Sequence, residues 1–250
     1  MDLMPETRVL LGVDVIGSAG NPGHQYNALW RALDRMLGTA LNECGIPNDE
    51  LLDWEPGGDG VLYTLPSRRL GTALDLTEHL DRLAAAHNRK HKPDLRLRIA
   101  VELGAVGDEP GYYAPKVWQQ RLLNARAFKE LMKHCLRERP EGSVNTGLIV
   151  SAPAFREVFS GDYTRTVQRH DFAEIEASEK EFAETAWVRV PGLDSRTLKE
   201  FVAATAATDT AGITETTPEP KTRVVNQVFG TMNGVQAGDV HGDINFGPKA

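Results

Sequence analysis

The sequence of 250 residues lacks several features that would place it in a specialised class of protein. Its two cysteines, Cys44 and Cys135, stand far apart and in no metal-ligand spacing, so neither a zinc site nor a disulfide framework is expected. No apolar run approaches the length of a membrane-spanning helix, and residues 1–8 contain no signal-peptide core. These absences favour a cytoplasmic protein with no membrane partner.

An excess of positive charge is also missing. The 35 Asp and Glu residues outnumber the 28 Lys and Arg residues, which gives a formal net charge of −7 at pH 7. A mildly acidic chain is poorly suited to non-specific nucleic-acid binding, so no nucleic-acid partner is expected. The hydrophobic share of 41% is that of a globular core, and the length indicates one domain with a tail.

The order of the predicted elements indicates the fold class. Apolar runs, alternating segments and helical periodicity follow one another as strand, helix, two hairpin strands, helix and strand. These elements are predicted at residues 8–15, 22–44, 51–55, 61–65, 66–87 and 95–103. Such a βαββαβ order predicts an α/β (α+β) fold with a ferredoxin-like sheet and helices on one face.

The remainder of the domain continues this alternation of helices and strands. A helix is predicted over residues 117–136, a strand over 147–151, a short helix over 153–159, and paired strands over 172–175 and 186–190. The domain is therefore expected to span residues 8–192.

The composition changes after this domain. Thr, Ala, Glu and Pro dominate residues 193–223, which favours a disordered linker, with a short helix around 198–207 as the alternative. Residues 224–247 are again apolar, Gly-rich and β-prone. That segment is too short to build a core of its own.

Two carboxylates are expected at one edge of the predicted sheet. Asp14 ends the first strand, and Asp59 lies in the Gly-rich tip of the adjacent hairpin. Together with the backbone carbonyl of Val15 they would form an all-oxygen site suited to Mg²⁺ or Mn²⁺. The small residues Gly17 and Ser18 leave room for phosphates beside backbone N–H groups. The alternative is that Asp14 caps a strand end and Asp59 is an ordinary turn residue.

Three segments, taken together, resemble the successive signatures of class III nucleotidyl cyclases. They have the order and spacing of that family's βαββαβ catalytic domain, and they lie at residues 13–18 (VDVIGS), 58–60 (GDG) and 98–104 (RIAVELG). The chain is also similar to an actinobacterial group of cyclase-like proteins, through residues 121–125 (RLLNA), 180–182 (KEF) and 186–192 (AWVRVPG). The resemblance covers about residues 8–192.

This resemblance implies an enzyme that converts a nucleoside triphosphate into a 3′,5′-cyclic nucleotide and pyrophosphate. Asp14, Asp59 and the Val15 carbonyl would hold two Mg²⁺ or Mn²⁺ ions, and Arg121 would be the catalytic residue that meets charge on the transferred phosphoryl group. The alternative for Arg121 is a solvated helix residue. Because class III sites form between two subunits, the resemblance also implies a head-to-tail homodimer.

The chain departs from the family pattern at three positions. Val117 stands where the family has an Asn, and Glu102 where it has a His. Glu55 replaces the base-reading Lys of adenylate cyclases and resembles the guanine-reading residue of guanylate cyclases, although a pyrimidine substrate is an alternative. The substrate-binding residues implied are Gly17, Ser18, Glu55 and Gly58.

These departures leave other functions open. One is a degenerate cyclase fold that binds nucleotide and signals by assembly through its tail. The run 57–59 (GGD) also suggests a GGDEF-type enzyme, but Gly60 and Val61 stand in place of the Glu and Phe of that motif.

Residues 224–247 resemble the short Gly-rich signalling motifs of actinobacterial immunity and NLR-associated proteins, and these motifs in turn resemble the RHIM amyloid motif. The match lies in residues 235–238 (VQAG) and 238–247 (GDVHGDINFG). Short β-prone segments with little charge can stack in register with a matching segment of another protein. The resemblance implies a protein partner that shares the motif and a role in antiphage signalling. The alternatives are an unstructured tail or one added edge strand.

Overall fold

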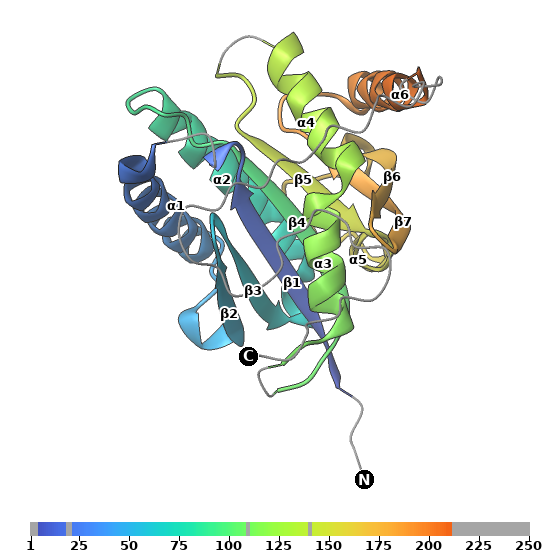
Figure 1. Cartoon of the computed structure of the whole chain (residues 1–250). Helices are drawn as coiled ribbons and strands as arrows, with labels where there is room; N and C mark the ends of the chain where they lie inside the picture. The colour runs from blue at the N-terminus through green and yellow to red at the C-terminus, as the bar shows by residue number, and fades with distance from the viewer. Residues whose placement is uncertain (1–4, 19–21, 109–110, 140–141, 212–250) are drawn as a thin grey trace, which may run out of the picture. The chain divides into compact units, whose positions relative to one another are not determined.

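The structure is a computed structural model that describes residues 5–18, 22–108, 111–139 and 142–211. The motif predicted at residues 224–247 lies outside this part. The contacts divide the chain into one unit over Met1–Asp209 and another over Thr210–Ala250. The first unit is built on a seven-stranded sheet in the order β2-β3-β1-β4-β5-β7-β6 (Figure 1).

The strands of this sheet are β1 (Glu6–Val15), β2 (Asp53–Gly57), β3 (Gly60–Pro66), β4 (Leu97–Val106), β5 (Thr146–Ser151), β6 (Ala173–Glu179) and β7 (Phe182–Arg189). The helices are α1 (Gly23–Glu43), α2 (Leu70–Asn88), α3 (Ala114–Asn124), α4 (Arg126–Glu138), α5 (Ala152–Ser160) and α6 (Ser195–Ala211). Short 3₁₀ turns are η2 (Asn48–Glu50), η3 (Ser67–Arg69) and η4 (Arg169–Asp171).

The first four strands and the first two helices form the predicted βαββαβ core. β1 is antiparallel to both β3 and β4, and the order β2-β3-β1-β4 is that of the ferredoxin-like fold. The register places Asp14 opposite Gly60 of β3 on one side and opposite Arg98 of β4 on the other. The predicted fold class is confirmed.

Helices cover both faces of the sheet. On one face α1, α2 and α5 pack against Val9, Leu11 and Val13 of β1, while on the other α3 and α4 pack around Ala100 and Ile149 (Figure 1). The two helices of the βαββαβ core, α1 and α2, lie on one face as predicted. The later helices α3 and α4 lie on the other face, so the prediction of helices on one face does not hold for the whole domain. These two helices cover the face toward which the Asp14 side chain points.

The helix predicted over residues 117–136 is two helices in the structure. α3 ends at Asn124 and α4 begins at Arg126, because Ala125 has φ −51° and ψ 129°, outside the helical region. Ala125 and the neighbouring Leu123 and Phe128 are buried, so a continuous apolar periodicity conceals the break. The turn lets α3 cross β1 and β4 while α4 packs toward β6.

The linker predicted over residues 193–223 begins with a helix, so in its first part the structure supports the alternative of a short helix around residues 198–207. Residues 195–211 form α6, in which Leu198 is buried and Phe201 packs against the same cluster as Phe128. The carboxylate of Asp194 accepts a hydrogen bond of 2.8 Å from the Thr197 N–H, which caps the first turn. The Thr- and Ala-rich composition concealed the two apolar side chains that attach this helix to the domain.

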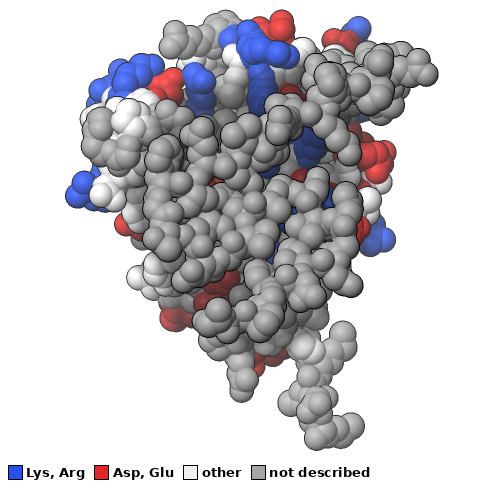
Figure 2. Space-filling model, viewed as in Figure 1, with Lys and Arg blue, Asp and Glu red and all other residues white. Residues whose placement is uncertain are grey.

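Positive charge gathers at one end of the molecule. Figure 2 shows Lys and Arg side chains at the upper edge of the visible face, where α2 and α4 end. Arg137 and Arg139 stand at the end of α4, and Arg89 and Lys90 follow α2. Cations near the C-terminal end of a helix interact favourably with the negative end of its dipole, so these side chains stabilise both helices.

Two further features concern the predictions from composition. Within the described ranges, no helix combines the length and the apolar character that crossing a membrane requires. Cys44 and Cys135 are free thiols, and burial raises the pKa of each to about 11.

Candidate active site

A cleft of about 960 Å³ opens beside α3. The end of β1 and the β2–β3 hairpin line one part of it, and α3 and the turn between β6 and β7 line another. Four of the residues predicted for the site lie along it: Asp14, Glu55, Asp59 and Arg121. Lys116 of α3 and Lys180 of the β6–β7 turn, which the sequence analysis did not assign to the site, line it as well.

The structure brings Asp14 and Asp59 together where β1 ends beside the hairpin. The Val15 N–H donates a hydrogen bond of 3.2 Å to the backbone carbonyl of Asp59, and the Ser18 hydroxyl donates to the Asp59 carboxylate. Ser18 therefore orients the Asp59 side chain. The side chain of Val15 is buried in the core on the opposite face, so only its backbone can take part in a site here.

Glycines shape the turns around this pair. Gly17 and Gly58 have φ of +73° and +34°, and a Cβ at either position would meet no atom within 4 Å. Their role is therefore the backbone conformation. At Gly60 a Cβ would lie 2.3 Å from the Val13 carbonyl oxygen, so β3 can approach β1 here only because residue 60 has no side chain.

Arg98 of β4 binds the Asp14 carboxylate through two hydrogen bonds. Its Nε donates to Oδ1 at 3.1 Å, and a terminal nitrogen donates to Oδ2 at 2.6 Å. Asp14 is only 8% exposed, and burial raises its pKa to about 6, against the influence of Arg98 and with a smaller contribution from Asp59. In the sequence Arg98 stands out only as part of the motif at residues 98–104, and the β1–β4 register is what places it opposite Asp14.

Lys116 of α3 holds two carboxylates of the hairpin. Its Nζ donates to Asp53 at 2.9 Å and also to Glu55, and its side chain is almost fully buried. Burial disfavours the charged form of Lys116, but the hydrogen bonds to Glu55 and Asp53 outweigh it, so the pKa lies above its usual value. The Glu55 expected to read a base is therefore one member of a cluster of two carboxylates and an ammonium group.

Arg121 lies on the last turn of α3 and lines the cleft. It makes no ion pair with any other residue that the structure describes. Val117 also lines the cleft and is 42% exposed, and the neighbouring Trp118 is 47% exposed. These two residues form an exposed apolar surface on the same helix.

Glu102 is a structural residue in a different environment. It is 1% exposed, and its Oε1 accepts hydrogen bonds of 2.8 Å from the Ser151 hydroxyl and from the Leu103 N–H. Burial raises its pKa to about 7 despite these hydrogen bonds. Its Oε2 has no partner among the described residues. Glu102 does not line the cleft.

The donor set at Asp14 and Asp59 suits a divalent ion. Two carboxylates and the Val15 carbonyl are the hard oxygen ligands that Mg²⁺ prefers. The described residues contain no cluster of three or more His, Cys, Asp or Glu side chains, and both Asp14 oxygens accept hydrogen bonds from Arg98. A bound ion and the Arg98 guanidinium would therefore compete for the Asp14 carboxylate.

This fold is that of nucleotidyl cyclase catalytic domains. One structure of a bacterial light-regulated adenylyl cyclase superposes with a TM-score of 0.51 and 10% identity, over 82% of this chain and 100% of the other. An adenylate/guanylate cyclase/hydrolase from Silicibacter pomeroyi superposes with a TM-score of 0.50 and 14% identity, over 76% and 100%.

A second structure of a bacterial light-regulated adenylyl cyclase gives a TM-score of 0.50 and 13% identity over 81% of this chain. This chain spans only 59% of the length of that protein. No protein-family model matches the sequence, and no curated protein matches it. The likeness therefore lies in the fold.

Proposed function

We propose that this protein is a metal-dependent nucleotidyl cyclase, which converts a nucleoside triphosphate into a 3′,5′-cyclic nucleotide and pyrophosphate for intracellular signalling. The observation that carries the proposal is the single cleft that contains Asp14, Asp59 and Arg121 on a cyclase-type fold. In the reaction the 3′-oxygen bonds to the α-phosphorus, the bond to the bridging oxygen breaks, pyrophosphate leaves, and the hydroxyl proton goes to water.

The two aspartates have the metal-binding role in this proposal. Asp14, Asp59 and the Val15 carbonyl would hold Mg²⁺ or Mn²⁺, two ions per site. The ions would lower the pKa of the ribose hydroxyl and neutralise charge on the pyrophosphate. A metal ion bound at Asp14 would have to displace the Arg98 guanidinium from the carboxylate, because Arg98 donates to both of its oxygens. Arg121 donates to the oxygens on which charge develops. Gly17, Ser18 and Gly58 shape the turns beside them.

The Lys116 cluster supports a base-binding role for this corner of the cleft. Glu55 pairs with Leu62, which lies opposite Gly12 of β1. Two inter-strand spacings across β3 and two residues along β1 therefore separate it from Asp14, roughly 10–12 Å between Cα atoms at ordinary sheet spacings. That separation suits a nucleotide with its phosphates at Asp14 and its base at Lys116. Because the cluster offers two acceptors beside one donor, it fits guanine, whose edge carries the N1–H and N2 amino donors beside the O6 acceptor.

The proposal includes a head-to-tail homodimer. Val117 and Trp118, both exposed beside Arg121, are apolar side chains that a second copy would bury. In such a dimer the aspartates of one copy would meet the Arg121 of the other.

A turnover assay tests the proposal. Purified full-length chain is incubated with Mn²⁺ and each of the four nucleoside triphosphates, and products are identified by mass. We expect one cyclic nucleotide with equimolar pyrophosphate, reduced roughly 100-fold or more in Asp59→Ala because a metal ligand is lost. Asp49→Ala, a change at an exposed residue outside the cleft, is the matched control. Absence of pyrophosphate with all four substrates would exclude the function.

A second candidate function is a catalytically degenerate nucleotide-binding adaptor. The apolar Val117 in the cleft and the Arg98 held on Asp14 favour it. In that case nucleotide would trigger assembly through residues 224–247 with a protein partner that shares the motif, in antiphage signalling. Light scattering would show nucleotide-dependent assembly that is lost on deletion of residues 224–250, and any turnover would exclude this as the sole role.

A further inference from the structure

The two edges of the sheet differ in how they are protected. β2 forms one edge, has five residues and contains Pro56, and short edge strands with proline resist pairing with another strand. β6 forms the other edge, has seven residues and contains neither Pro nor Lys. In the described ranges it pairs only with β7, so its outer backbone groups are open to another strand.

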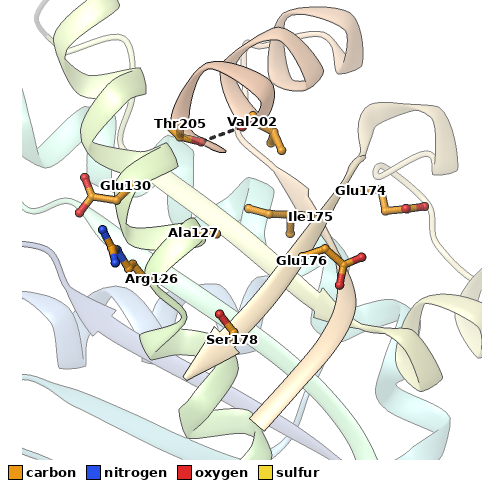
Figure 3. Close-up of a pocket in the computed structure, with 9 residues that line it drawn as sticks. All are labelled: Arg126, Ala127, Glu130, Glu174, Ile175, Glu176, Ser178, Val202 and Thr205. Atoms are coloured by element: carbon orange, nitrogen blue, oxygen red, sulfur yellow. Dashed lines mark hydrogen bonds between the residues drawn. The ribbon is translucent and has the colours of Figure 1, made fainter. Parts of the chain in front are cut away.

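A groove of about 440 Å³ lies beside β6 (Figure 3). α4 contributes Arg126, Ala127 and Glu130, and α6 contributes Val202 and Thr205. Figure 3 shows the Ile175 side chain of β6 pointing toward Ala127, while Glu174 and Glu176 point away from α4. The groove thus offers apolar contacts beside a strand whose outer edge is open.

Negative charge dominates the polar side chains here. Glu130, Glu174 and Glu176 line the groove with a single cation, Arg126. Glu174 and Glu176 are both exposed and stand two residues apart, so they project from the same face of β6. A strand added beside β6 has the same period of two, so Lys or Arg at alternate positions can meet both carboxylates. Two copies of β6 would instead place like charges together.

We propose that the edge of β6 binds an extended basic segment of a partner protein, which adds to the sheet as an eighth strand. The main-chain hydrogen bonds of β6 give affinity, and Glu174 and Glu176 select Lys or Arg at alternate positions. The apolar side chains of the segment contact the half-buried Ala127 and Val202, with the buried Ile175 beneath them. This surface is separate from the cleft of Asp14 and does not depend on the proposed cyclase activity.

Backbone NMR of the full-length chain tests the site with two ten-residue probes, one alternating Lys with Val and one alternating Glu with Val. We expect the outward amides of β6 to exchange rapidly with solvent in the free chain. The basic probe should shift and protect the amides of residues 173–179, and the acidic probe should leave them unchanged. No response to the basic probe would overturn the proposal, as would protection of these amides in the free chain, which would show that the edge is already covered.

Variants separate recognition by the edge from general attraction to an acidic surface. The double variant Glu174→Lys with Glu176→Lys should weaken the basic probe roughly tenfold, because two rim charges are reversed. Glu157→Lys on α5, an exposed charge reversal elsewhere, should have no effect. Equal weakening by both variants would refute a local site.

Methylation of the probe tests the strand itself. N-methyl groups on alternate residues block the hydrogen bonds of one edge of a strand. Two isomers of the basic probe, methylated at the odd or at the even positions, therefore differ in which edge is blocked. The isomer whose free edge faces β6 should bind, and the other should not. Equal binding of both isomers would overturn strand addition. Self-association of the free chain that disappears in the double variant would identify a second copy of this chain as the occupant instead.

Discussion

Asp14 and Glu102 are both buried carboxyl groups, but only one of them accepts hydrogen bonds from a charged partner. Asp14 accepts two hydrogen bonds from the Arg98 guanidinium, so its charge has a counterion. Among the described residues, Glu102 accepts hydrogen bonds only from the neutral Ser151 hydroxyl and Leu103 N–H. Ionisation of Glu102 is therefore costly, and its pKa of about 7 lies well above its ordinary value of 4.5.

This raised pKa predicts that stability depends on pH. The folded chain binds the Glu102 proton more tightly than the unfolded chain, so the stabilisation is complete below pH 4.5 and is lost as pH rises through 7. In Glu102→Gln the side chain cannot ionise, while its carbonyl can still accept the same hydrogen bonds. We expect this variant to be more stable than the parent at pH 8, by about 3 kcal/mol, and to differ little at pH 4.

Urea denaturation at pH 4, 6 and 8 measures the difference. Glu157→Gln, an exposed change of the same chemistry, should leave the pH dependence as it is. The raised pKa of Asp14 affects the pH dependence of stability equally in the parent, Glu102→Gln and Glu157→Gln, so its effect cancels when the three are compared. Parallel curves for the parent and Glu102→Gln would contradict the assignment.

At the scale of elements, α2 holds the loop after α5. The Asp75 carboxylate accepts hydrogen bonds from the N–H groups of Arg165, Thr166 and Val167, at 2.8 to 3.1 Å. One turn earlier, a Cβ at Gly71 would lie 2.0 Å from the backbone oxygen of Tyr163. The loop therefore lies directly on the helix backbone, a contact that helical periodicity does not reveal.

The same substitution at two helical glycines tests this contact. Gly71→Ala should destabilise the protein by roughly 2–3 kcal/mol, because the loop must move away from α2. Gly38→Ala, on the exposed face of α1 with nothing within 4 Å of the added carbon, should stabilise it by about 0.5–1 kcal/mol through helix propensity. Thermal and urea unfolding give both values, and a neutral Gly71→Ala would show that the loop moves without cost.

At the scale of the whole molecule, one cleft contains both halves of the proposed site. Asp14 and Asp59 belong to the βαββαβ core, whereas Arg121 comes from α3, which follows it. Catalysis could thus use both halves of one chain, or the aspartates of one copy with Arg121 of another. The exposed Val117 and Trp118 favour the second arrangement.

Mixing two inactive variants decides between these arrangements. Asp59→Ala and Arg121→Ala should each lose activity alone. If sites are shared between subunits, an equimolar mixture allowed to exchange should recover about a quarter of the parent activity, because half of the dimers carry one intact site of two. If each chain uses its own cleft, the mixture should stay inactive.

The sequence alone was sufficient for the parts of the molecule that depend on local pattern. Alternating and apolar runs predicted the βαββαβ core, because the side-chain periods of strands and helices differ. The same patterns placed Asp14 at a strand end and Asp59 in a hairpin tip. They could not show the break at Ala125 or the attachment of α6, because there a few buried side chains outweigh composition.

The tertiary structure alone decided which charged groups meet. The register of β1 and β4 put Arg98 on Asp14, and the crossing of α3 over the sheet put Lys116 on Glu55. These pairs are separated by 84 and 61 residues. No local pattern specifies such contacts, because they depend on how strands align and where helices pack. The sequence by itself thus determined that one aspartate stands at the end of the first strand and the other in the adjacent hairpin tip. Only the fold determined which charged groups surround them.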